Sequence, residues 1–195
     1  MSGFLFVSQI LLWVGLAVIG LLVAALARQV GVLHQRIAPA GALTLHKNIE
    51  AGQIAPQFRL AALDGSEVTV GGAHQQSQLI FFVSPDCPVC KTLLPTFKSA
   101  MRSERTWLRT VLASDGDGAS HRKMIKAHHL DGIPYVVSEA LGRAFGVSRL
   151  PYAVLIDEQG KVAALGLVNS REHLESLFEA KERGVTSLQQ FLSAA

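Results

Sequence analysis

The sequence predicts an α/β domain of buried strands and amphipathic helices, preceded by one membrane-spanning helix. The first 27 residues carry no charged side chain, and an apolar run at 79–83 leads directly into a helical pattern. Residues 153–168 have the pattern of two strands joined by a tight turn. With 195 residues, 49% of them apolar, the chain has room for one such domain beside the membrane segment.

The N-terminal segment is long and apolar enough to cross a bilayer. Residues 10–27 are 18 uninterrupted apolar or glycine residues, which as a helix approach the ~30 Å of a hydrocarbon core. A cleaved signal peptide is the alternative, with Ala25-Leu26-Ala27 as its cleavage site. The absence of Lys or Arg before the apolar run and the length of that run favour an uncleaved anchor.

We therefore divide the chain into an anchor at 1–28, a tether at 29–50 and a domain at 51–195. Pro39 and Gly41 interrupt any helix that continues from the membrane. The net charge of +3 is spread along the chain without a basic run, so no nucleic-acid partner is expected.

The charges next to the anchor and the chemistry of the cysteines favour opposite orientations. Arg28, Arg36 and Lys47 all follow the apolar segment, a bias that favours a cytoplasmic domain. Long domains cross membranes largely regardless of such charges, and dithiol chemistry suits an oxidising compartment. We expect a single-pass protein with its soluble domain in an oxidising compartment.

Residues 58–70 alternate as a β-hairpin does. Phe58 and Leu60 lie on one face of an expected edge strand, and Asp64-Gly65 supplies the turn into a second strand at 68–70. We expect this hairpin to be structural.

Both cysteines of the chain, Cys87 and Cys90, lie where the apolar run 79–83 ends and a helix begins. Pro88 suits the first helical position, where its missing N–H costs nothing, so Cys87 is expected at the N-cap. The free N–H groups of the first turn and the positive end of the helix dipole then favour a thiolate on Cys87. Cys90, one turn further in, is suited to resolve a mixed disulfide.

Two charged neighbours are expected to tune the pKa of Cys87 in opposite directions. Lys91 favours the thiolate, whereas the adjacent carboxylate of Asp86 disfavours a second negative charge. The sequence therefore predicts an activated cysteine without setting the size of the effect.

This segment resembles the thioredoxin superfamily. Cys87-Pro88-Val89-Cys90-Lys91, followed by Pro95, looks like the CxxC-Lys helix of that superfamily with its kinking proline. The resemblance implies a thioredoxin-like fold, a central mixed sheet flanked by helices, and a redox-active cysteine pair with no metal or other cofactor. Residues 82–95 more narrowly resemble the MauD family, accessory proteins of methylamine dehydrogenase. That resemblance implies that the oxidising compartment is the periplasm, with the anchor in the inner membrane.

The remaining elements follow the order of that fold. We expect strands at 110–114, 136–137, 153–157 and 161–168 and a helix at 121–130. A last helix is expected to begin with Asn169 as its N-cap, because Glu172 three residues later completes a capping pattern.

Two prolines compete for the cis-proline of the superfamily, Pro134 and Pro151. The strand, tight turn, strand and helix that follow Pro151 resemble the closing unit of the superfamily, so we assign it that role. The resemblance then places Pro151 beside Cys87 and lets the Leu150 backbone pair with a substrate peptide as a strand does. Two trans prolines are the alternative.

Thiol–disulfide exchange is the leading interpretation, with Cys87 and Cys90 as its catalytic residues. A metal-delivery module is the first alternative, although two thiolates are half of a tetrahedral site and His74 and His121 are distant in sequence. A thiol peroxidase is the second alternative, but this chain has Ile80 at the position where such enzymes are expected to carry a proline. A structural disulfide is the third, and so short a loop stabilises little.

The direction of exchange is suggested by what precedes the cysteines. Reducing members of the superfamily often carry a buried acid six positions before the first cysteine, where this chain has Phe81, and a Trp where it has Asp86. The MauD resemblance implies an oxidase or isomerase that assists maturation of the small subunit of methylamine dehydrogenase, with an unidentified electron donor or acceptor.

Overall fold

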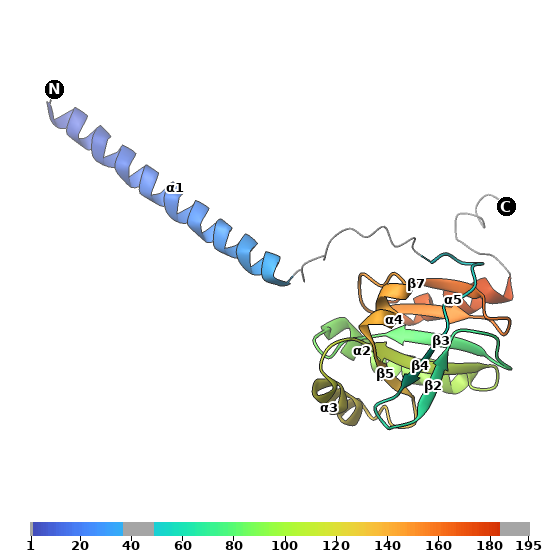
Figure 1. Cartoon of the computed structure of the whole chain (residues 1–195). Helices are drawn as coiled ribbons and strands as arrows, with labels where there is room; N and C mark the ends of the chain where they lie inside the picture. The colour runs from blue at the N-terminus through green and yellow to red at the C-terminus, as the bar shows by residue number, and fades with distance from the viewer. Residues whose placement is uncertain (1, 37–48, 184–195) are drawn as a thin grey trace. The chain divides into compact units, whose positions relative to one another are not determined.

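The computed structural model describes residues 2–36 and 49–183. They belong to two compact units, Met1–Leu45 and His46–Ala195 (Figure 1). Helix α1 (Ser2–Arg36) forms the first unit. Within it Leu5–Val23 has a mean hydropathy of 2.4, long and apolar enough for a membrane span. It therefore remains a candidate anchor.

Helix α1 continues past residue 28, where we expected the anchor to end, as far as Arg36. The physical reason is that no proline follows the apolar run before Pro39. The predicted helix break at 37–42 and the rest of the tether to residue 48 lie outside the described residues.

The second unit is built on a five-stranded sheet in the order β5-β4-β3-β6-β7. β3 is parallel to β4 and antiparallel to β6, so the sheet is mixed. The strands are β3 (Ser77–Phe82), β4 (Leu108–Ser114), β5 (Tyr135–Val137), β6 (Tyr152–Ile156) and β7 (Val162–Leu167). Every residue of β3 is buried, which explains the apolar run of its last four residues, 79–82.

Helices α2 (Pro88–Glu104), α3 (Gly118–His128) and α5 (Arg171–Glu182) cover one face of this sheet. β3 alternates between two cores, because Leu79 and Phe81 pack with those helices while Ile80 and Phe82 face the other way. The second core is closed by α4 (Glu139–Ala144) and by the N-terminal hairpin. This arrangement is the predicted thioredoxin-like fold.

The hairpin consists of β1 (Phe58–Ala61) and β2 (Glu67–Val70), which form a two-stranded sheet of their own. Gly65 takes a left-handed φ of 88°, and the Asp64 carboxylate accepts the Ser66 N–H at 2.9 Å. A turn that the sequence predicted thus closes a hairpin that packs on the sheet.

Two details of the last elements differ from expectation. The N-cap of α5 is Ser170, whose hydroxyl accepts the His173 N–H, while the N–H of Asn169 donates to the His173 ring. Asn169 lies one residue too early to cap this helix. Helix α4 was not predicted, because six residues are too few to show a helical period.

Candidate active site

The cysteine pair and Pro151 meet at one end of the sheet. β3 and β6 pair in a register that sets Phe82 opposite Tyr152, so Pro151 lies beside the segment that leads from Val83 into the cysteines. The Leu150–Pro151 peptide bond is cis, as predicted, and within residues 49–183 it is the sole cis bond. Pro134 is therefore the trans proline.

Cys87 and Cys90 form a disulfide across the first turn of α2, with their Cα atoms 5.2 Å apart. Cys87 occupies the predicted N-cap, with extended backbone angles, and its sulfur accepts the Cys90 N–H at 3.1 Å. Cys90 is fully buried, whereas Cys87 is partly exposed. An incoming thiol can therefore reach the first sulfur more readily than the second.

Two stacked aromatic rings lie in the same core as Cys90. Phe81 on β3 stacks on Phe97 of α2 with ring centroids 4.3 Å apart, and both side chains are fully buried. This contact fixes the strand against the helix that carries the cysteines.

No carboxylate lies buried below the disulfide in the part of the domain that the structure describes. Its buried polar side chains are Ser77, Gln78, Ser114 and His121, and Phe81 fills the position where reducing relatives often hold an acid. The pair thus has no internal carboxylate to exchange protons with at that position.

The two predicted tuning residues flank the disulfide with exposed side chains. The backbone N–H of Asp86 donates to the Ser84 hydroxyl at 3.2 Å, which shapes the turn before the first cysteine. Lys91 contributes its backbone N–H to the Cys87 carbonyl. Their effect on the Cys87 sulfur stays a prediction.

The sequence did not indicate a buried polar cluster that lies at the end of β4, the strand next to β3. His121 is almost fully buried, with one ring nitrogen 3.0 Å from the Tyr135 hydroxyl and the other 2.8 Å from the Asp115 carbonyl. Burial raises the pKa of Tyr135 to about 12, while a hydrogen bond to Ser114 acts against that rise and the Asp115 charge adds to it.

This cluster fixes the turn between β4 and α3. Because the Ala113 carbonyl accepts the Val83 N–H at 2.9 Å, the end of β4 adjoins the strand that leads to Cys87. No local sequence pattern indicated the cluster, since its members come from three separate elements.

The two histidines considered as metal ligands are both engaged in other contacts. His121 bonds as described, and the His74 ring contacts the Gly71 carbonyl at 3.0 Å and Arg109 at 3.3 Å. Among residues 2–36 and 49–183, no three His, Cys, Asp or Glu side chains are grouped so that they could hold a metal ion.

Comparison with known proteins finds one family model and several full-length relatives that agree with one another. The Redoxin family model matches residues 50–181. The methylamine utilization protein MauD of Paracoccus versutus is 44% identical over 98% of this chain and 96% of its own length. MauD of Paracoccus denitrificans is 43% identical over 100% of this chain and 97% of its own length.

Solved structures share the fold. The thioredoxin domain of a thiol-disulfide oxidoreductase from Bacteroides vulgatus superimposes with a TM-score of 0.58 at 17% identity, covering 66% of this chain and 98% of that domain. At that identity the likeness concerns the fold alone.

Proposed function

This chain belongs to the MauD family of the thioredoxin superfamily, and from that membership we propose a specific redox role. It is a membrane-anchored thiol–disulfide oxidoreductase that introduces or rearranges disulfides in the small subunit of methylamine dehydrogenase. The observation that carries the proposal is the position of the Cys87 sulfur, partly exposed at the start of α2 with the buried Cys90 behind it.

The oxidising reaction begins with the disulfide. A client thiolate attacks the Cys87 sulfur, the bond to Cys90 breaks, and Cys90 leaves with the electron pair as a thiolate. A second client thiolate then attacks the client sulfur of the mixed disulfide and expels the Cys87 thiolate. The client gains one disulfide, the pair gains two electrons, and an electron acceptor of the compartment must reoxidise the pair.

The rearranging reaction begins with the reduced pair. The Cys87 thiolate attacks a wrongly paired client disulfide and forms a mixed disulfide, and a client thiolate then displaces Cys87 to give a new pairing. Cys90 displaces the client when no such thiolate arrives, so the client is reduced and the pair oxidised. The N–H bond to the Cys87 sulfur supports both reactions because it stabilises the sulfur as an anion.

The Leu150 backbone supports a direct role in holding the client. The Pro151 carbonyl is already used by the Val168 N–H at 3.0 Å. Among the described residues, no hydrogen-bond partner lies against the N–H or carbonyl of Leu150, which are thus free to pair with an extended client segment.

Phe81 supports the oxidase or isomerase direction over that of a general reductant. Resolution of a mixed disulfide by the buried Cys90 requires loss of its proton, and the hydrocarbon side chain of Phe81, buried in the same core, offers no acceptor. An oxidising periplasm suits the oxidase direction, whereas the isomerase direction needs an electron donor that keeps the pair reduced.

A trapping experiment tests the cysteine roles and the client together. In cells that produce methylamine dehydrogenase, the Cys90→Ala variant should accumulate a mixed disulfide with the small subunit, visible as a band that dithiothreitol removes. The matched Cys87→Ala variant should trap none. A deletion strain should contain mispaired and degraded small subunit, and normal client disulfides in that strain would contradict the proposal.

A further inference from the structure

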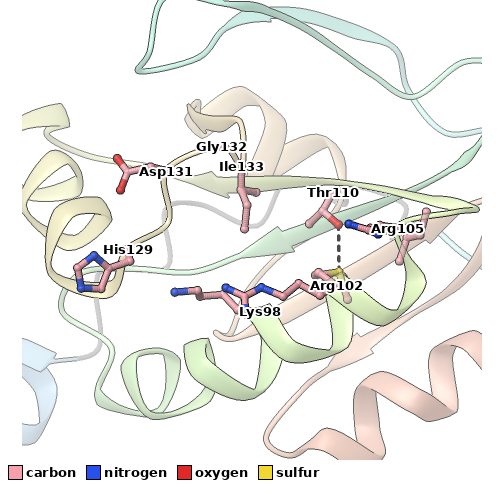
Figure 2. Close-up of a pocket in the computed structure, with 10 residues that line it drawn as sticks. Lys98, Arg102, Arg105, Thr110, His129, Asp131, Gly132 and Ile133 are labelled. Atoms are coloured by element: carbon pink, nitrogen blue, oxygen red, sulfur yellow. Dashed lines mark hydrogen bonds between the residues drawn. The ribbon is translucent and has the colours of Figure 1, made fainter.

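A basic groove lies at the opposite end of the domain from the cysteines. It has a volume of about 290 Å³ and is bounded by the C-terminal half of α2, the start of β4 and the loop after α3. Its basic lining consists of three cations, Lys98, Arg102 and Arg105, together with His129 (Figure 2). We call this feature the basic groove.

The three long cations come from one face of α2 and from its C-cap, Arg105. Lys98, Arg102 and Arg105 recur at intervals of four and three residues, the spacing of neighbours on a helix. Figure 2 shows the side chains of Lys98 and Arg102 both pointing toward His129. Like charges at this spacing destabilise a helix, so a bound anion would relieve their repulsion.

Protein groups do not neutralise these cations. The four ion pairs among the described residues involve none of the three, and Lys98 donates only to the His128 carbonyl, at 2.9 Å. Asp131 is the single acid in the groove lining, and Figure 2 shows its carboxylate pointing away from the arginines.

The excess of positive charge is local to the basic groove and is not a property of the whole domain. From residue 49 onward the chain has 15 Lys or Arg, which is the total of 18 less Arg28, Arg36 and Lys47, and 15 Asp or Glu. A domain with no formal net charge thus gathers three unpaired cations in one groove, which favours an anionic partner there.

The chain enters the domain at the same end of the sheet. The Gly52 N–H donates to the Val162 carbonyl at the start of β7, whereas the disulfide follows the far end of β3. The 17 residues of α2 separate the two ends by about 25 Å. A protein client bound in the groove would therefore be held away from Cys87.

A membrane surface is always close to the domain. If Leu5–Val23 spans the bilayer, the helix to Arg36 and the twelve residues 37–48 keep the domain within about 60 Å of it. Tethering raises the effective concentration of the bilayer, so even weak attraction suffices for docking.

We propose that the basic groove binds the phosphate headgroups of anionic phospholipids, and that this docking turns the cysteine end of the domain toward the aqueous phase. The contacts are ion pairs from Lys98, Arg102 and Arg105 to phosphate oxygens. The proposal depends on the N-terminal anchor and not on the redox chemistry.

The test uses the full chain in lipid nanodiscs, with Cys87 and Cys90 changed to serine so that one added cysteine carries a fluorescent donor. The donor is placed at Ser103, exposed beside the groove, or at Val89, exposed beside the disulfide. Acceptor dyes label the lipid headgroups. The discs contain phosphatidylcholine alone or a roughly 3:1 mixture with phosphatidylglycerol.

In anionic discs, energy transfer should rise for the donor at 103 and rise less for the donor at 89, because docking leaves the cysteine end of α2 about 25 Å further from the lipid. High salt should reverse both changes. Arg102→Gln with Arg105→Gln should lower the ratio of docked to undocked domain by about 30-fold, from about 1 kcal/mol per cation at an anionic surface. Arg59→Gln with Arg143→Gln removes two exposed cations outside the groove and should change little.

Three results would overturn the proposal. The first is energy transfer at 103 that ignores lipid charge, and the second is an equal loss in the control variant. The third is energy transfer at 103 that changes in neutral discs only when the methylamine dehydrogenase small subunit is added. That result would assign the groove to an acidic protein segment. Because the labelled chains lack both native cysteines, none of these results bears on the proposed redox function.

Discussion

Removing Cys90 should leave Cys87 as a thiol that reacts faster in the folded protein than in the unfolded chain. The Cys87 sulfur accepts the N–H of residue 90 at 3.1 Å and lies at the start of a 17-residue helix. The helix dipole favours a nearby anion by ~0.3–2 kcal/mol, and the hydrogen bond adds to it. A sum of ~1–3 kcal/mol raises the ratio of thiolate to thiol by about 5- to 150-fold.

Reactivity rises less than ionisation, because a stabilised thiolate is a weaker nucleophile, with a Brønsted slope of about 0.4–0.5. An ordinary thiol is only a few per cent ionised at pH 7. The expected result is alkylation about two- to fourfold faster in the folded than in the denatured protein at that pH. This ratio should grow as the pH falls and drop below one where both forms are fully ionised.

The assay is the rate of iodoacetamide labelling of reduced Cys90→Ala protein, in native buffer and in guanidinium chloride, across this pH range. The control is Cys87→Ala, in which the remaining Cys90 is fully buried, so folding should slow its labelling roughly tenfold or more. A folded Cys87 that labels no faster than the unfolded chain at any pH would refute the reasoning. Equal labelling of the two folded variants would refute the assignment of Cys87 as nucleophile.

Three further predictions concern the scaffold. Folding raises the pKa of Tyr135 to about 12, so the folded state keeps a proton that the unfolded chain releases, and stability should fall by up to about 2–3 kcal/mol as the pH rises from about 10 to about 12. Urea titrations of Tyr135→Phe should lack this loss. Phe97→Ala should lower the free energy of unfolding by ~3–5 kcal/mol through loss of the contact with Phe81, measured by urea denaturation, and Phe97→Leu should cost clearly less. The hydrogen bond from Lys181 holds the pKa of Glu158 below its usual value, so the pair stabilises the fold at neutral pH and ceases to do so as the pH falls through that lowered pKa. Lys181→Gln should cost ~0.2–1 kcal/mol at pH 7 and flatten this acid dependence of thermal unfolding.

The redox centre was predictable because its determinants are local. The apolar strand before Cys87, the proline after it and the helical spacing beyond Cys90 are neighbours in sequence, and they place the first cysteine at an N-cap without reference to the rest of the chain. The long apolar N-terminal helix was predictable for the same reason. Assigning Pro151 as the cis proline required the family resemblance as well.

Three features could be seen only in the tertiary structure, because they depend on how strands and helices pack: the position of Pro151, the His121 cluster and the basic groove. The order β5-β4-β3-β6-β7 brings Pro151 beside the cysteine segment and joins His121 to Tyr135 and Asp115. The same packing sets the cations of α2 against the loop at His129 to form the basic groove. Residues so far apart in sequence leave no short-range pattern, because their contacts exist only after separate elements have packed together.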